Sequence, residues 1–260
     1  MELHTLRRGS GRPLVLVHGL GASGASWAPV LDGLAAEREV IAVDLPGFGR
    51  TPPLAGPVTI ATLTDALGAF LSAQGLTDAD LVGSSMGARM VLELVRRGST
   101  GGSVVSLDPG GFWSRGESLW FRSTVGPSVK LVQAVQPAVP ALASRAATRT
   151  LLMAQFSARP WELPADLVAQ ELQGFTAPSV DAAFSALVNG PRQEGAPAGA
   201  ARGKLTIGWG RHDRVTLPAQ AARAAAVFPD ARLVWFDHSG HFPMWDEPEA
   251  TVRVVLDATE

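Results

Sequence analysis

Short apolar runs alternate with amphipathic segments over the first 113 residues of the chain. Apolar runs of three to five residues predict buried strands, and apolar residues spaced three or four apart predict helices. We expect strands at 14–18, 40–43, 80–82 and 104–107, and helices at 27–37, at 59–73 and in the segment that closes at 96–98. Strands that alternate with helices are typical of an α/β fold. The pattern therefore predicts a doubly wound, mostly parallel sheet.

The alternation stops after Trp113. Residues 114–199 contain helical segments interrupted by prolines and no convincing strand, which predicts an inserted helical cap. Glycine and proline between 190 and 199 indicate a return linker. The alternation then resumes, with strands at 205–209 and 233–236 and helices at 218–228 and 249–256. We therefore assign the core to residues 1–113 and 200–260 and the cap to 114–199.

Composition narrows the class of protein. The 260 residues are 46% hydrophobic and 18% charged, which favours a sizeable core. A net charge of −2 gives no reason to expect nucleic acid or an anionic membrane as a partner. The absence of cysteine excludes disulfides, a thiolate nucleophile and a cysteine-ligated metal. We expect a cytoplasmic protein with a small-molecule substrate and no metal or cofactor, either a monomer or a homodimer.

A candidate nucleophile lies between a predicted strand and a predicted helix. Residues 83–87 read Gly-Ser-Ser-Met-Gly, the only G-x-S-x-G in the chain. Strand, sharp turn and helix are the context of a nucleophile elbow, in which Ser85 is held in a strained turn. The alternative interpretation is a small-residue turn with no chemistry.

A serine hydroxyl needs a base and an acid to become a nucleophile. His241 follows Gly240 between the last strand and the last helix, and we prefer it to His238 because Gly240 suits a tight loop. Asp213 follows the strand at 205–209 and is the candidate acid. Asp108, after the strand at 104–107, is the alternative acid, although a role in capping its Pro-Gly turn is the preferred interpretation.

Backbone N–H groups are expected to form an oxyanion hole. The N–H of Met86 lies at a helix N-terminus, where such groups are free and the helix dipole favours negative charge. The second donor is expected from Leu20, between Gly19 and Gly21, in the loop after the first predicted strand. For His18 we expect a hydrogen bond to its own loop rather than catalysis.

The same loop also fits a dinucleotide-binding fingerprint. Residues 19–24 match G-x-G-x-x-G, and Asp44 follows Gly24 by 20 residues. Three features disfavour it: His18 before the glycines suits an oxyanion loop, Asp44 belongs to a Pro-Gly turn, and the chain has no tyrosine for the Tyr-Lys couple of short-chain reductases.

Five motifs together resemble the α/β-hydrolase superfamily, in its order of nucleophile, acid and histidine. They are His-Gly-Leu-Gly at 18–21, Asp-Leu-Pro-Gly-Phe-Gly at 44–49, Gly-Ser-Ser-Met-Gly at 83–87, Gly-Arg-His-Asp at 210–213 and Gly-His at 240–241. The resemblance implies a triad of Ser85, Asp213 and His241. It also implies oxyanion donors at Leu20 and Met86.

The elbow is similar to those of small-molecule esterases and of serine C–C hydrolases. Serine at position 85 disfavours the superfamily's epoxide hydrolases and haloalkane dehalogenases, which use aspartate there. Ala88 stands where the C–C enzymes more often carry glycine. We expect an ester or related acyl hydrolase working through an acyl-enzyme. A C–C hydrolase of a vinylogous 1,5-diketone, a non-hydrolytic enzyme that reuses the triad, and a ligand-binding module stay open.

Aromatic residues of the cap are candidates for the substrate pocket. They are Trp113, Trp120, Phe121, Phe156 and Trp161, to which Phe242 beside the histidine is added. The alternative for each is packing within the cap. Arg122, Arg159 and Arg192 are candidates for binding a substrate carboxylate, with solvated surface charge as the preferred interpretation.

Overall fold

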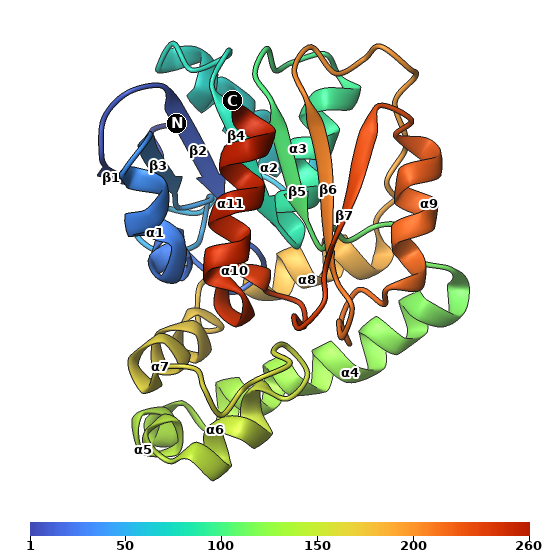
Figure 1. The fold of residues 1–260 in the computed structure, drawn as a ribbon. Coiled ribbons are helices and arrows are strands. Elements are labelled where there is room, and N and C mark those ends of the chain that lie inside the picture. Colours follow the sequence, from blue (N-terminus) through green and yellow to red (C-terminus); the bar gives the residue numbers. More distant parts are fainter.

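The apolar runs form the strands of a seven-stranded sheet in the computed structural model, which describes residues 1–260 (Figure 1). The strand order is β1-β3-β2-β4-β5-β6-β7, and every neighbouring pair is parallel except β1 and β3. The strands are β1 (Thr5–Arg8), β2 (Pro13–Val17), β3 (Glu39–Val43), β4 (Asp80–Ser84), β5 (Val104–Leu107), β6 (Leu205–Gly210) and β7 (Ala231–Phe236). The predicted doubly wound α/β fold is confirmed.

β1 was not predicted, and the first predicted strand, at 14–18, corresponds to β2. β1 pairs antiparallel with β3 at the edge of the sheet, with Thr5 opposite Val43. Its residues are half-buried or exposed, so it carries no apolar run. An edge strand with one solvent face needs few apolar residues, which removes the signal that identifies the buried strands.

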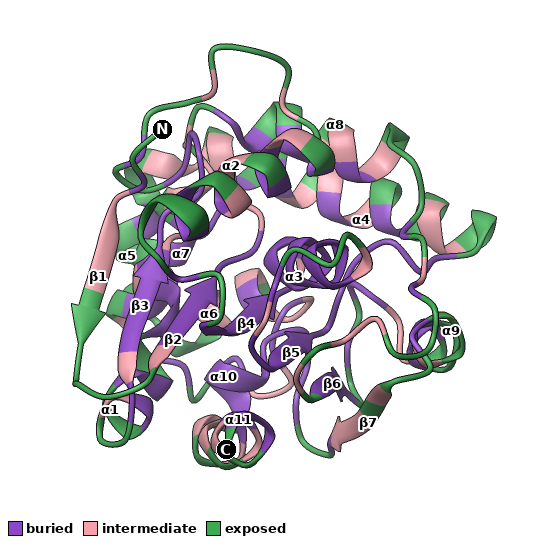
Figure 2. Cartoon of the chain, turned by 90° about the horizontal axis from the view of Figure 1, so that it is seen from above, coloured by how far each residue is buried: buried purple, intermediate pink, exposed green.

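Helices cover both faces of the sheet (Figure 2). α1 and α11 pack together on one face, whereas α2 and α3 pack together on the other. α3 is buried from Met86 to Val95, because it lies between the sheet and its neighbours. The core helices are α1 (Ala28–Ala35), α2 (Ile60–Ala73), α3 (Met86–Arg96), α9 (Ala219–Val227), α10 (Pro243–Asp246) and α11 (Pro248–Thr259).

The register of the central strands brings their carboxyl ends to one edge. Val17 pairs with Gly83, and Ser84 pairs with Leu107, which in turn pairs with Gly208. The loops after β2, β4, β5 and β6 therefore start side by side. In parallel sheets this edge is where ligands bind.

All of the regular secondary structure between β5 and β6 is helical. Its helices are α4 (Arg115–Ala134), α5 (Val139–Ser144), α6 (Ala146–Met153), α7 (Ala165–Gly174) and α8 (Val180–Asn189). In Figure 1, α4, α5, α6 and α7 lie below the strands, and α8 lies level with the lower ends of the strands. We refer to the segment that carries these five helices as the cap. No helix of the protein combines the length and apolarity that crossing a bilayer requires.

Candidate active site

The turn between β4 and α3 holds Ser85 in a backbone conformation that few residues adopt. Its φ of 55° and ψ of −112° lie outside the regions that L-residues prefer. A Cβ at Gly83 would lie 2.4 Å from the carbonyl oxygen of Gly87, and a Cβ at Gly87 would lie 2.3 Å from that of Val17. The two flanking positions therefore require glycine, because strand and helix approach too closely for any side chain.

Ser85 is hydrogen-bonded to a histidine that lies 156 positions away in the chain. Ser85 Oγ lies 2.8 Å from His241 Nε2, and His241 Nδ1 lies 2.8 Å from Asp213 Oδ2. An ionised carboxylate only accepts hydrogen bonds, so Nδ1 carries the proton and Nε2 is free to accept the serine proton. The structure thus brings together all three predicted catalytic side chains.

Backbone hydrogen bonds fix the loop that carries the histidine. The N–H of His241 donates to the carbonyl of Phe156 at 2.8 Å, and the N–H of Gly240 donates to Asp246 Oδ2 at 2.7 Å. The same Asp246 oxygen accepts the N–H of Ala158 in the cap at 2.8 Å. Because Phe156 and Ala158 belong to the cap, the position of the base depends on cap residues.

The carboxylate of Asp213 is held by hydrogen bonds from the loop that follows it. Oδ1 accepts the N–H groups of Val215 at 2.7 Å and Thr216 at 3.1 Å, and Oδ2 accepts the hydroxyl of Thr216 at 2.7 Å. Donors of this kind fix the orientation of a carboxylate. The carboxylate therefore faces the imidazole in one position.

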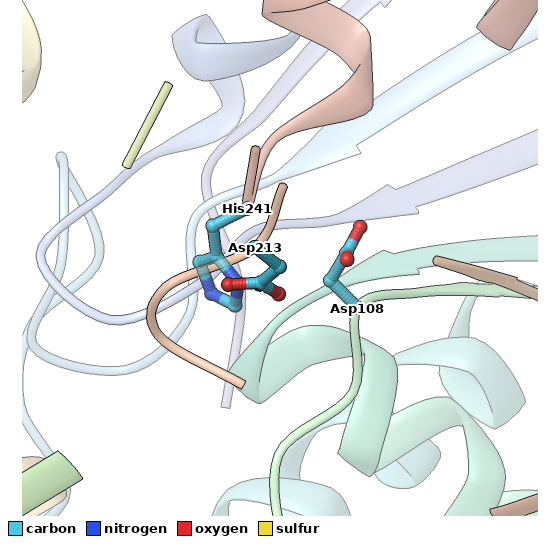
Figure 3. A group of neighbouring side chains, drawn as sticks. All are labelled: Asp108, Asp213 and His241. Carbon is cyan, nitrogen blue, oxygen red and sulfur yellow. Dashed lines mark hydrogen bonds and ion pairs between the residues drawn. The ribbon is translucent and has the colours of Figure 1, made fainter. Parts of the chain in front are cut away.

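Asp108, the alternative acid, lies on the far side of Asp213 from His241 (Figure 3). It makes no hydrogen bond to the imidazole, and its Oδ1 accepts the N–H of Gly210 at 2.8 Å. It does not cap its own turn as expected, because the adjacent strand supplies the donor instead. Complete burial and the charge of Asp213 raise the pKa of the Asp108 carboxyl well above its usual range.

Asp108, Asp213 and His241 have potential ligand atoms within 4.8 Å of one another, a spacing that a metal ion requires. Both oxygens of Asp213 and Nδ1 of His241 are already engaged in the hydrogen bonds described above. The donor set therefore fits an acid–base relay better than a metal centre.

The loop after β2 lies against the serine, as an oxyanion loop must. A Cβ at Gly19 would lie 3.7 Å from Ser85 Oγ. The N–H groups of Leu20 and Met86 donate to no acceptor within the protein. Two free donors beside the nucleophile are what a developing oxyanion needs.

His18 and Asp44 hold this loop in place. Burial lowers the pKa of His18 to about 4, so its ring is neutral, with Nδ1 donating to the Gly19 carbonyl at 2.7 Å and Nε2 accepting the N–H of Leu45. Asp44 accepts the N–H groups of Gly24 and Arg50, each at 2.8 Å. Asp44 is buried, and both of its oxygens accept hydrogen bonds from the fold, so it is not presented to a ribose, which disfavours the dinucleotide interpretation.

An apolar pocket lies above Ser85 and His241, between the sheet edge and the cap. The core side contributes Leu20, Val215, Phe242 and Trp245. The cap contributes Glu171 and seven apolar residues, which are Phe121, Val125, Met153, Phe156, Leu172, Phe175 and Leu187. A pocket of this composition suits an apolar acyl group.

Three of the six predicted substrate-binding aromatics line this pocket, namely Phe121, Phe156 and Phe242. The other three do not, and the prediction is corrected for them. Trp113 is buried behind the lining, stacked on Phe121 with ring centroids 5.1 Å apart. Trp120 is 45% exposed, with its Nε1 donating to the carbonyl of Arg214, and Trp161 is 54% exposed at the cap surface.

Sequence reasoning missed Glu171 entirely. It lies on the buried face of α7 with Leu167, Val168 and Leu172. A single acid among apolar positions three or four residues apart was the signal that could have found it. Burial raises the pKa of its carboxyl from 4.5 to about 7. None of Arg122, Arg159 and Arg192 lines the pocket.

Comparisons with known proteins identify the family and the fold. The sequence model of the family described as alpha/beta hydrolase fold matches residues 12–248. A 2-hydroxy-6-oxo-6-phenylhexa-2,4-dienoate hydrolase from Burkholderia cepacia is 27% identical over 268 aligned positions, covering 98% of this chain and 90% of the relative. An esterase from Thermogutta terrifontis superposes with a TM-score of 0.73 at 19% identity, covering 98% of this chain and 92% of that one. A meta-cleavage product hydrolase from Pseudomonas fluorescens IP01 superposes with a TM-score of 0.73 at 18% identity, covering 98% and 93%.

Proposed function

This chain belongs to the alpha/beta hydrolase family, and from that premise we propose that it is a serine hydrolase of small apolar esters or related acyl compounds. The observation that carries the proposal is the hydrogen-bonded series from Ser85 through His241 to Asp213, with 2.8 Å at each step. Ser85 and His241 line an apolar pocket. A hydroxyl that a neutral imidazole can deprotonate is the requirement for nucleophilic attack on a carbonyl.

In the first half of the reaction, Ser85 Oγ bonds to the carbonyl carbon while its proton passes to His241 Nε2. The carbonyl oxygen becomes an oxyanion and accepts the N–H groups of Leu20 and Met86. Each such donor contributes roughly 3 kcal/mol to stabilising the transition state. Collapse breaks the bond to the leaving alcohol, which takes the proton from His241, and an acyl-enzyme remains.

In the second half, water replaces the alcohol. His241 Nε2 accepts a proton from the water as its oxygen attacks the acyl carbon. The second tetrahedral intermediate collapses, the proton returns to Ser85 Oγ, and the carboxylic acid leaves. Asp213 stays ionised in both halves and stabilises the imidazolium by accepting the Nδ1 proton.

A C–C hydrolase is the second candidate, favoured by the full-length similarity to the Burkholderia cepacia dienoate hydrolase. A dienoate carries a carboxylate, and no lysine or arginine lines the pocket of this chain. Besides His241, the only side chain of the pocket lining that can carry a charge is Glu171, and its carboxylate repels an anion. The charge of the pocket therefore disfavours an anionic substrate such as a dienoate. A binding module without turnover is disfavoured, because no member of the triad is missing.

The test compares Ser85→Ala with the neighbouring variant Ser84→Ala. Ser84 is buried and its hydroxyl has no hydrogen-bond partner, so its loss leaves the nucleophile untouched. On p-nitrophenyl esters we expect Ser85→Ala to lower kcat by at least about 10⁴-fold and Ser84→Ala to retain activity. A fluorophosphonate should label Ser85, and His241→Ala should abolish the labelling.

Two results would overturn the proposal. Near wild-type turnover by Ser85→Ala would remove the serine from the mechanism. Bleaching of a coloured dienone substrate by a protein that releases no nitrophenol from any ester would favour the C–C hydrolase instead.

A further inference from the structure

One acidic side chain lies in a pocket wall that is otherwise apolar. Glu171 is 6% exposed and projects from α7 of the cap into the cavity above Ser85. A buried acid without a cationic partner destabilises a fold, so its presence calls for an explanation beyond packing. The mechanism described above does not use it.

The hydrogen bonds of Glu171 leave one oxygen free. Oε1 accepts the hydroxyl of Ser26 at 2.6 Å and the amide of Gln170 at 3.4 Å. Ser26 belongs to the turn that follows the oxyanion loop, so the side chain is fixed between cap and core. Oε2 has no partner within the protein, and no lysine or arginine lines the pocket.

We propose that Glu171 is a specificity-determining residue, which selects acyl substrates bearing an ammonium group on the chain and rejects substrates bearing a carboxylate. The inference rests on the proposed acyl hydrolase function, because it names the substrate class of the same site. An ammonium can donate to the free Oε2 in a medium of low dielectric, where charge pairing is strong. A substrate carboxylate would meet a like charge with no cation to offset it.

The selection should depend on pH. The pKa of Glu171 is raised to about 7 by burial, so the carboxyl is neutral in acid and ionised above that value. The other titratable group that lines the pocket is His241, and a positive charge there would also disfavour an ammonium relative to a carboxylate. The part of the pH dependence that Glu171→Gln removes is therefore the part that belongs to Glu171. We expect the ammonium preference to grow from pH 6 to pH 8.

Binding is measured first, on Ser85→Ala protein by calorimetry at pH 8, with hexylammonium, 1-hexanol and hexanoate as ligands. We expect hexylammonium to bind at least about tenfold more tightly than hexanoate, equivalent to about 1.4 kcal/mol. Adding Glu171→Gln, which keeps an acceptor for Ser26, should bring the ratio to near one. The control is Asp166→Asn, which removes an exposed charge from the same helix outside this pocket and should leave the ratio unchanged.

Turnover is measured second, with p-nitrophenyl esters of hexanoic, 6-aminohexanoic and adipic acids. We expect kcat/KM to fall from the amino ester to the neutral ester to the carboxylate ester, and Glu171→Gln to flatten this order. Equal binding of the cationic and anionic ligands, or a ratio that Glu171→Gln leaves intact, would overturn the inference. If no ester is hydrolysed, the proposed function fails, whereas the calorimetry still decides the role of Glu171.

Discussion

The two walls of the active site, the edge of the sheet and the cap, meet at one pocket but are built by different means. At the sheet edge, backbone contacts and hydrogen bonds hold each reacting group: glycines crowd the turn of Ser85, and three donors fix Asp213. In the cap, the lining residues other than Glu171 are apolar and pack against one another, as Phe156 does against Phe175.

This difference teaches where the protein tolerates change. A side chain cannot replace Gly83 or Gly87 without displacing backbone, whereas an apolar residue of the cap can be exchanged for another of similar volume at modest cost. In the proposed function, the sheet edge supplies the reacting groups, and the cap supplies most of the pocket that would select the substrate. Each of the following variants changes a residue of one wall, and the measurement tells whether activity, substrate preference or stability depends on that residue.

The largest effect is expected at the sheet edge, from Asp213→Asn. The amide cannot hold the imidazole in the required tautomer, so kcat should fall by about 10³–10⁴-fold. Asp108→Asn is the matched control, because Asp108 is equally buried but does not contact His241. Steady-state kinetics on an ester should show less than about a tenfold loss for the control. Equal losses in both variants would mean that the two acids share the role.

The effect of Glu171→Gln on the free energy of unfolding should depend on pH. The native carboxyl keeps its proton up to about pH 7, whereas the unfolded carboxyl loses it near 4.5. Between these values the native state binds more protons, so stability falls as pH rises and the loss is complete above 7. The variant removes this penalty, which is at most about 3 kcal/mol at pH 8. Urea unfolding at pH 4.5 and 8 should show a gain at the higher pH alone. A gain of the same size at both values would contradict it.

A smaller effect is expected from the apolar part of the cap. Phe156→Ala removes a ring from the pocket but retains the carbonyl that accepts the N–H of His241. Kcat/KM for a hexanoate ester should fall about tenfold or more, in line with roughly 1–3 kcal/mol of lost apolar contact. Acetate esters, which do not reach the ring, should change much less. A uniform loss for both esters would show instead that the ring positions the base.

The smallest effect is expected from Trp161→Ala. This side chain is 54% exposed on the cap and does not line the pocket. Kcat/KM should stay within about twofold of the wild-type value for every ester. A selective loss on long-chain esters would mean that substrates extend beyond the pocket to the cap surface.

What the sequence could predict differs in the same way between the two walls. The proximity of Ser85, Asp213 and His241 was predictable because each follows a predicted strand in a turn or loop at the carboxyl edge of the sheet, and the residue types fit one kind of chemistry. The strands at the centre of the sheet were predictable because burial on both faces makes each of them a continuous apolar run. β1 lacked that signal because one of its faces meets solvent.

In the cap, composition indicated an apolar wall but not which residues form it. Trp120 and Phe121 are neighbours on α4, yet only Phe121 lines the pocket. Short helices broken by prolines leave the inward face undefined until their packing is known. The spacing of Glu171 among apolar residues of α7 signals that the acid is buried, but what a buried acid does depends on the cavity around it, which the sequence does not describe.

The place where the cap joins the sheet has a consequence for how such proteins can diversify. β5 and β6 are adjacent, hydrogen-bonded strands, with Val104 opposite Leu205, and the whole excursion leaves from one and returns to the next. An exchange of that segment for one of another length or sequence would leave every strand pairing intact. Because of this insertion point, the cap could change in evolution while the strands that carry Ser85, Asp213 and His241 keep their arrangement. A different cap could then present a different substrate to the same three side chains.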